Sequence, residues 1–333
     1  MREWAWRALG VVAPLVNLAL RLTSRRAGVA IVYHAIEPSE GDPTRDVLPA
    51  CSVDRFHREV RHLRRDYQLV PASALPHSVA TRRRFQRFPL AVTFDDDLTS
   101  HLDHAVPVLR AEGIRATFFL GGWSLGRTTS PWWRLLQHAA DSGVPASALR
   151  ALVPNGNDAG GPKLEGKLQE LASSVLSLSP EQKDQFEADL SEVIGLPGPS
   201  RPLNASEIQM LAAEHEVGFH TRDHHDLCQL DREQLWDALR SGRRELSDLV
   251  GRELELIAYP HGKADRRVAD AARAAGYRFG FTTEAGAITP SCDPMLLGRL
   301  TTSASSSAKL SLQVALRLLG RGTTRRHALA GVT

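Results

Sequence analysis

The chain of 333 residues is poor in cysteine, and its three cysteines, Cys51, Cys228 and Cys292, lie far apart. So few thiols at such spacing exclude a disulfide framework and a zinc site built from cysteines. They are compatible with a reducing compartment. We therefore expect a cytoplasmic protein, associated with a membrane or not, and leave an exported form open.

A strong charge of one sign is also missing, because 41 Lys and Arg stand against 38 Asp and Glu, a formal net charge of +3. This balance does not call for a nucleic-acid partner, and we expect none. With 42% hydrophobic and 24% charged residues, the composition is that of a globular protein with a full core. The length suits one large domain or two ordinary ones and leaves the oligomeric state open.

Long hydrophobic runs are scarce as well. The apolar run at 8–20 is too short to span a bilayer, and no signal-peptide cleavage site follows it. Segment 1–27, with Trp4 and Trp6 beside arginines, predicts either a helix at a membrane interface or a helix covering one end of the fold. The leucine-rich part of 306–333 is a second candidate amphipathic helix. Peripheral membrane contact through both ends is therefore one expectation.

The chain does contain a regular alternation of apolar runs and helical patterns. Apolar, β-prone runs predict buried strands, and amphipathic helices fall between most of them. This order predicts a parallel sheet with crossover helices. The expected strands are 28–34, 69–70, 90–94, 116–120, 216–219, 254–259, 277–283 and 297–301.

The segment 123–205 interrupts this alternation. It contains few candidate catalytic groups, so we interpret it as a helical insertion in the main fold. Trp132 and Trp133 could line a cleft, although paired aromatics on a helix are more often core residues. The expected helices are 132–140, 164–176 and 180–194, with linker compositions at 154–162 and 195–199.

Three adjacent carboxylates, Asp95, Asp96 and Asp97, follow the strand at 90–94. Acids in direct sequence repel one another and need a cation or a proton to coexist. A metal site would satisfy this need, and so would an acidic helix N-terminus. The stretch alone leaves both interpretations open.

Histidines follow three other predicted strands: His34, His220 with His224, and His261. The carboxyl ends of parallel barrel strands share one face, so these groups should converge with the aspartates. His220 and His224 would point the same way if the turn after their strand is helical. Two histidines, one carboxylate and a free position make an open catalytic site for zinc or a similar metal. His101 and His104, just past the aspartates, are expected on the surface of a helix.

Five short motifs stand in one order along the chain: Thr93-Phe94-Asp95-Asp96, Ala116-Thr117-Phe118-Phe119, Gly218-Phe219-His220-Thr221-x-x-His224, Tyr259-Pro260-x-Gly262 and Ala275-Gly276-Tyr277. With these motifs the chain resembles the polysaccharide deacetylases of the NodB-homology type, carbohydrate esterase family 4, over 28–305 apart from the insertion. The resemblance implies an α/β fold, an irregular, TIM-like (β/α) barrel of about seven strands.

The resemblance also implies residue roles. Asp96, His220 and His224 would hold a divalent metal, zinc first, with cobalt, nickel or iron as alternatives. Asp95 would be the general base that activates the water on that metal, and His34 the acid that protonates the leaving amine. A core histidine is the alternative for His34. The expected reaction, hydrolysis of a carbon–nitrogen amide bond, agrees with this chemistry.

The chain departs from the family pattern at three positions. Asp97 replaces the usual glycine, where an unusual backbone angle is one explanation. His225 replaces a frequent proline, and Ala258 replaces an arginine that supports the base. Arg299, on another predicted strand, is expected to take over that role.

Three residues are expected to line the substrate site: Tyr259, His261 and His225. Tyr259 could instead pack in the core, and His261 could simply be a residue of the turn. The expected substrate is an amino sugar carrying an N-acetyl group, in a polymer or a lipid-linked glycan. A deformylase or amidase on a non-sugar amide, a catalytically inactive glycan-binding barrel and a membrane-associated scaffold are the rivals.

Overall fold

The structure is a computed structural model that describes residues 16–42, 44–125, 131–154, 168–194, 201–284, 286–302 and 307–320. Within these residues, seven parallel strands close a barrel in the order β1-β5-β6-β7-β8-β9-β10, because β1 pairs with both β5 and β10. The barrel strands are β1 (Val29–Tyr33), β5 (Pro89–Asp95), β6 (Thr117–Leu120), β7 (Glu216–Phe219), β8 (Leu256–Ala258), β9 (Phe279–Thr282) and β10 (Leu297–Thr301).

Three shorter strands complete the β structure: β4 (Gln68–Leu69) pairs beside the start of β5, while β2 (Ile36–Glu37) and β3 (Cys51–Ser52) pair with each other. The irregular, TIM-like (β/α) barrel implied by the resemblance is confirmed. Each predicted strand is present within a few residues of its expected limits.

Side-chain alternation along the strands separates two cores. On β1, Val29, Ile31 and Tyr33 pack outward against the surrounding helices. Ala30 points inward and belongs to the same small cluster as Ala91 of β5. Side chains along β5 alternate in the same way between the inside and the outside of the barrel. Asp95, four residues after the inward-pointing Ala91, therefore points into the barrel mouth.

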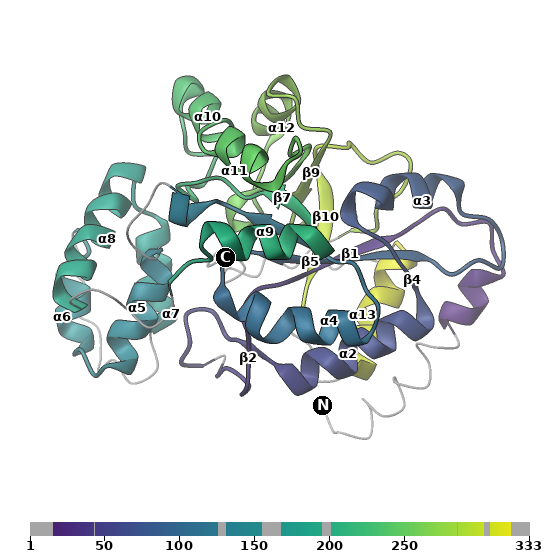
Figure 1. Ribbon diagram of the computed structural model, residues 1–333, viewed down its shortest axis with the longest axis horizontal. Helices are drawn as coiled ribbons and strands as arrows, with labels where there is room; N and C mark the ends of the chain where they lie inside the picture. The colour runs from purple at the N-terminus through teal and green to yellow at the C-terminus, as the bar shows by residue number, and fades with distance from the viewer. Residues whose placement is uncertain are drawn as a thin grey trace.

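Helices surround the barrel (Figure 1). They are α2 (Val53–Asp66), α3 (Leu75–Thr81), α4 (Val106–Ala111), α9 (Ala205–Glu214), α10 (Arg232–Ala238), α11 (Arg243–Val250), α12 (Arg266–Ala274) and α13 (Ser307–Leu318). Between β7 and β8 the chain forms two helices, α10 and α11, and Gly242 in a left-handed conformation (φ 78°) lies between them.

A short helix plugs the amino-terminal end of the barrel. Leu75 and Val79 of α3 cluster with Ala30 and Ala91 inside the barrel. The approach requires glycine at position 28, since a Cβ there would lie 2.6 Å from Val79 Cγ2. The barrel is therefore closed at one end, and its chemistry is confined to the other.

The segment 123–205 forms a helical lobe beside the barrel, at the left in Figure 1. Its helices are α5 (Trp132–Asp141), α6 (Ala146–Ala151), α7 (Leu168–Leu176) and α8 (Pro180–Ile194). They share an apolar core of their own, to which Trp132 and Trp133 both belong. The two linkers, expected at 154–162 and 195–199, lie almost wholly outside the described residues.

The two ends of the chain differ in what the structure describes. Residues 1–15 lie outside the described part, and 16–21 are helical. Leu310, Val314 and Leu318 of α13 are fully buried in the main core, so the apolar face of this helix covers the barrel. Among the helices that the structure describes, none is long and apolar enough to cross a membrane.

Candidate metal and catalytic site

The predicted site residues meet at the carboxyl-terminal mouth of the barrel. Asp95 ends β5 and Asp96 follows it, while His34 and His220 come directly after β1 and β7. Asp95, Asp96 and His220 are each at most 3% exposed. The convergence expected from parallel strands is therefore present.

Asp96, His220 and His224 form a cluster with the geometry of a metal site. One ligand atom from each lies within 4.8 Å of the others. Asp96 Oδ1 is 3.7 Å from the Nε2 atoms of both histidines. Both carboxylate oxygens of Asp96 and both Nε2 atoms are buried without a hydrogen-bond partner. Such a set of orphaned polar atoms is costly unless a cation joins them.

Electrostatics point the same way. Burial, together with the neighbouring charges of Asp95 and Asp97, raises the pKa of Asp96 well above its ordinary value. Burial lowers the pKa of His220 and, more strongly, that of His224. The two histidines are thus neutral near pH 7, the form that binds metals, and the charges of Arg134 and Arg299 offset only part of the rise in the pKa of Asp96.

One nitrogen of His220 is committed to the protein. Its Nδ1 lies 2.8 Å from the carbonyl oxygen of Ala258, to which it donates, so Nε2 keeps its lone pair. This is the outer hydrogen bond that usually orients a metal-binding histidine. Two imidazoles and one carboxylate fit zinc and, equally, cobalt, nickel or iron. The residues present therefore fit the expected divalent metal.

The route that joins His220 to His224 is not the helical turn considered for the sequence. Thr221 and His224 both have positive φ, 59° and 51°, and the segment between the strand and α10 is a loop. Asp96 (φ 76°) and His261 (φ 58°) share this left-handed conformation. Non-glycine residues of this kind are sparse and gather at functional sites.

Arg299 binds Asp95 through both ends of its guanidinium, with N–O distances of 2.6 and 2.7 Å. Burial alone would raise the pKa of Asp95, but Arg299 and nearby histidines lower it to about 2. The carboxylate is therefore ionised and fixed in orientation. Its Oδ2 faces the site, 4.0 Å from His34 Nε2 and 3.9 Å from His220 Nε2.

His34 lies beside Asp95 and outside the metal cluster, with its side chain 8% exposed. Burial lowers its pKa to about 4, partly opposed by the charge of Asp95. Its backbone oxygen is 3.3 Å from Nε2 of His101. The placement of His101 and His104 on a surface helix is wrong for His101, which is fully buried in a π-helical turn between Phe94 and Phe118.

Asp97 does not have the unusual backbone angle considered for it, because the left-handed residue is Asp96. The Asp97 carboxylate instead accepts hydrogen bonds of 2.7 Å from the backbone N–H groups of Gly121 and Trp123. Asp97 thus holds the turn after β6 against the turn after β5. It belongs to the frame of the site.

The three residues expected to line the substrate site lie in different surroundings. Tyr259 is fully buried and donates to the Met295 carbonyl at 2.9 Å, so it packs in the barrel wall. His261 is beside the metal cluster, its ring centroid 4.7 Å from that of His224. His225 faces the helical lobe, with Nε2 3.4 Å from Asp184 Oδ1.

The helical lobe also reaches the site, through Trp133. The sequence left open whether this residue lines a cleft or packs in a core. The ring centroid of Trp133 is 4.4 Å from that of His224, and the side chain belongs to the core of the lobe. Trp133 therefore packs in the core of the lobe and also contacts a predicted metal ligand. In the sequence, this position is marked by the Trp-Trp pair that opens helix α5.

A cavity of about 590 Å³ lies beside the site, between loop 35–50 and α5. Ala35, next to His34, and Trp133 belong to its wall. Arg134 also lines it, and this arginine interacts electrostatically with Asp96. Arg45, His138 and a few small or apolar side chains also line the cavity, together with five acidic residues: Glu37, Glu40, Asp42, Asp46 and Asp141.

Comparison with known proteins agrees with this geometry. The family model described as polysaccharide deacetylase matches residues 82–151 and 203–280. The matched residues contain β5 with its aspartates and β7 with its histidines. The unmatched stretch between them contains α7 and α8 of the helical lobe.

Solved structures with the same fold include three bacterial proteins. The deacetylase PplD of Streptococcus pyogenes, in complex with acetate, is 14% identical at a TM-score of 0.58, over 86% of this chain and 98% of that one. IcaB from Ammonifex degensii is 19% identical at a TM-score of 0.56, and the match covers 87% of this chain and 97% of IcaB. A polysaccharide deacetylase from Bacillus cereus is 18% identical at a TM-score of 0.54, and the match covers 86% of this chain and 69% of that one.

Fold and site define a (β/α)-barrel hydrolase whose polar residues gather at the carboxyl ends of the strands. The polysaccharide deacetylase family model matches the two stretches that hold the site residues, and the fold is shared with solved deacetylases, in agreement with the resemblance. The protein is accordingly a hydrolase that acts on carbon–nitrogen amide bonds.

Proposed function

We propose that the protein is a metal-dependent deacetylase that removes N-acetyl groups from an amino sugar within a polysaccharide. The observation that carries the proposal is the position of the unpartnered cluster Asp96, His220 and His224 beside an arginine-anchored carboxylate, Asp95. A site that merely bound glycan would have no use for this buried charge arrangement.

Asp96, His220 and His224 would hold the metal. A bound divalent cation supplies a Lewis acid that polarises the amide carbonyl and eases the ionisation of water. The chain provides the rest of the chemistry. Arg299 makes Asp95 a weak base, because it lowers the pKa of the carboxylate. Asp95 therefore depends on the bound cation, which eases the ionisation of water, to accept a proton from the attacking water.

His34 is the candidate for the second proton transfer. Its Nε2 is 4.0 Å from Asp95 Oδ2, so the base and the acid are neighbours. Water adds its oxygen to the acyl carbon and gives a proton to Asp95. Neutral His34 takes this proton from Asp95, 4.0 Å away, and passes it to the nitrogen as the C–N bond breaks, so that the nitrogen leaves as an amine. The products are acetate and a free amino sugar, and the protons balance between Asp95 and His34.

The cavity beside the site suits a sugar unit. Its volume of about 590 Å³ is within the range of small-ligand sites, and its wall is rich in hydrogen-bonding groups. The wall combines charged and amide side chains with the apolar surfaces of Trp133 and Leu48, and such a mixture suits a carbohydrate, which has both hydroxyl groups and apolar ring faces. A lipid-linked glycan stays the alternative substrate.

The test combines metal analysis with an activity assay. We expect about one equivalent of zinc, cobalt, nickel or iron per chain. We also expect amine release from an N-acetylglucosamine oligomer. His220→Ala/His224→Ala should lose both, whereas His77→Ala, a control at an exposed histidine away from the site, should keep both.

Each part of the result can contradict the proposal. Absence of metal under every loading condition would remove the mechanism. Metal with no amine release from any N-acetylated glycan, but with hydrolysis of small formamides or acetamides, would keep the amide chemistry and replace the substrate.

A further inference from the structure

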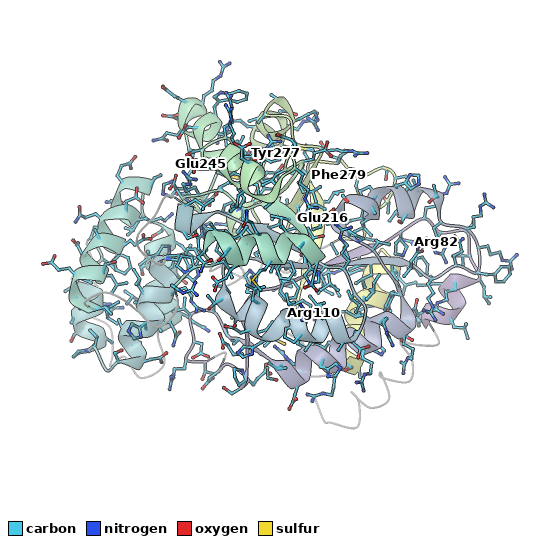
Figure 2. The ribbon with its side chains drawn as sticks, viewed as in Figure 1. Arg82, Arg110, Glu216, Glu245, Tyr277 and Phe279 are labelled. Atoms are coloured by element: carbon cyan, nitrogen blue, oxygen red, sulfur yellow. The ribbon has the colours of Figure 1, made fainter. Side chains whose placement is uncertain are left out.

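One face of the molecule, remote from the helical lobe, combines exposed apolar side chains with a concentration of arginines. The apolar members are Leu18, Leu22 and Phe85, which are 56%, 49% and 65% exposed. The arginines around them are exposed as well: Arg25, Arg26, Arg83, Arg84 and Arg87. We call these eight residues the basic apolar face. Figure 2 labels Arg82, beneath this face, at the end of the molecule opposite the helical lobe.

Two distant segments are locked together to make this face. Buried Arg82 donates to the carbonyls of Thr23 and Arg25, at 3.2 and 2.6 Å. Arg84 Nε donates to the Leu22 carbonyl at 2.7 Å. The exposed side chains therefore stand on a fixed base where the helical segment 16–21 meets the loop before β5.

Phe85 is the clearest case of an apolar side chain presented to the outside. Its N–H donates to the Arg21 carbonyl at 2.7 Å, and its φ is +71°. A bulky residue is uncommon in this left-handed conformation. The ring nevertheless projects outward, with the Arg84 guanidinium 4.8 Å from its centroid.

The other end of the described chain reaches the same region. A Cβ on Gly320, just past α13, would lie 3.0 Å from Arg25 Nη2, and Leu319 is 38% exposed. Apolar and basic side chains of the described residues thus accumulate at this end of the molecule.

We propose that the basic apolar face docks on an anionic lipid bilayer. Arginines attract acidic headgroups, and scattered leucine and phenylalanine side chains enter the headgroup boundary without needing a shaped pocket. Acidic groups that would weaken the attraction are few here, and the nearby Asp66 is bonded to Arg65 at 2.9 Å. A bilayer matches both features of the face, its charge and its projecting apolar groups.

Docking in this way fixes the direction of the active site. Arg25 and Arg26 precede β1, and Arg83 to Arg87 precede β5, so the face lies at the amino-terminal end of the barrel. The site is at the other end, about 20 Å away along β5 at roughly 3.3 Å per residue. The mouth would open away from the bilayer. This orientation favours a polymer that extends from the surface over a sugar attached to a lipid.

The test uses the full chain and sedimentation with two kinds of vesicle, phosphatidylcholine alone and phosphatidylcholine with phosphatidylglycerol. We expect binding to the anionic vesicles that weakens as salt rises. Each basic residue near an anionic surface contributes roughly fivefold in partition, so Arg26→Glu/Arg83→Glu should weaken binding at least about tenfold.

Matched variants separate this face from general charge and hydrophobicity. Leu22→Gln/Phe85→Asn should also weaken binding, and asparagine tolerates the left-handed backbone at position 85. Arg244→Glu/Arg266→Glu, with side chains 93% and 82% exposed on other helices, should leave binding within about twofold of the wild type. So should Met210→Gln, a change at a 63% exposed methionine.

Three results would overturn the proposal: no binding to anionic vesicles by the folded protein, equal loss in the control variants, or binding unchanged in both face variants. Retention by nucleic acid in place of vesicles would assign the face to another partner. Activity on soluble oligomers should be the same in the face variants as in the wild type. Failure of the docking proposal is therefore distinguishable from failure of the proposed function.

Discussion

Arg299 and Asp95 form a two-pronged ion pair inside the barrel, although 204 positions separate them in the sequence. The guanidinium comes from β10 and the carboxylate from the end of β5, and β1 lies between these two strands. Arg299 also donates to the Thr93 hydroxyl at 3.3 Å. The arginine thus supports the candidate base from across the sheet, whereas position 258, where the family often has an arginine, is an alanine.

Arg299→Met should impair both stability and catalysis. Removing one member of a buried pair leaves a charged group without compensation, at a cost of roughly 3–5 kcal/mol. The pKa of Asp95 would rise, because burial would no longer be opposed by the arginine. We therefore expect kcat/KM to fall about 100-fold or more, and its acid limb to move to higher pH. Urea unfolding and a pH–rate profile measure the two effects.

Arg299→Lys is the control for this prediction. It keeps the charge but not the paired geometry, so its losses should lie between those of the wild type and Arg299→Met. An unchanged pH profile in Arg299→Met would contradict the assignment of Asp95 as the titrating base.

Asp97→Ala should destabilise the fold more than it changes the chemistry. It removes the acceptors of two buried N–H groups, those of Gly121 and Trp123, each worth roughly 1–3 kcal/mol when left unpaired. Burial raises the pKa of Asp97 to about 6, so the carboxylate is ionised at pH 7 and its hydrogen bonds are charge-assisted. Asp97→Asn keeps one acceptor oxygen, so its stability should lie between those of the wild type and Asp97→Ala.

Chemical unfolding of the three proteins, with metal content measured alongside, checks this. Asp97→Ala that is as stable as the wild type but loses its metal would show that Asp97 acts on the metal site directly, against our interpretation.

The strands and the cluster of Asp95, Asp96, His220 and His224 could be predicted from the sequence because they depend on local rules. Apolar runs of five or so residues identify buried strands. Parallel strands then bring whatever follows them to one edge. The role of Arg299 depended on the family resemblance, because no local pattern pairs residues on strands β5 and β10.

Other features depend on tertiary contacts that no pattern expresses. His101 looks like one of two surface histidines, yet a π-helical turn rotates it between Phe94 and Phe118. His220 and His224 converge through left-handed loop residues, a geometry that their four-residue spacing does not reveal. The function of Asp97 became visible only when the turn after β6 was placed against it.

Acidification should destabilise the protein partly through His101. Burial lowers the pKa of His101 to about 3, against an ordinary value of 6.5. The folded state then binds fewer protons than the unfolded state, so this contribution is complete above pH 6.5 and declines as pH falls toward 3. Between pH 6.5 and 5 the loss from this one residue is about 2 kcal/mol.

His101→Gln cannot titrate, so its stability should fall less steeply over the same pH interval, by about 2 kcal/mol. His77→Gln, at an exposed position, is the matched control and should follow the wild type. Urea unfolding at pH 6.5 and pH 5 gives the comparison. Parallel declines in all three proteins would mean that His101 is protonated in the folded state.

His34→Gln decides between a catalytic and a structural histidine at the end of β1. If His34 protonates the leaving amine, glutamine should lower kcat by roughly 100-fold to 10,000-fold, the usual range for a general acid. KM and metal content should stay close to the wild type, because His34 is not in the metal cluster. A merely structural histidine would instead show reduced stability with kcat per folded molecule unchanged.

His104→Gln serves as control, since His104 follows the same aspartates but is 30% exposed and 3.9 Å from Glu37. Equal kcat in the two variants would exclude His34 as the acid and leave the proton to solvent.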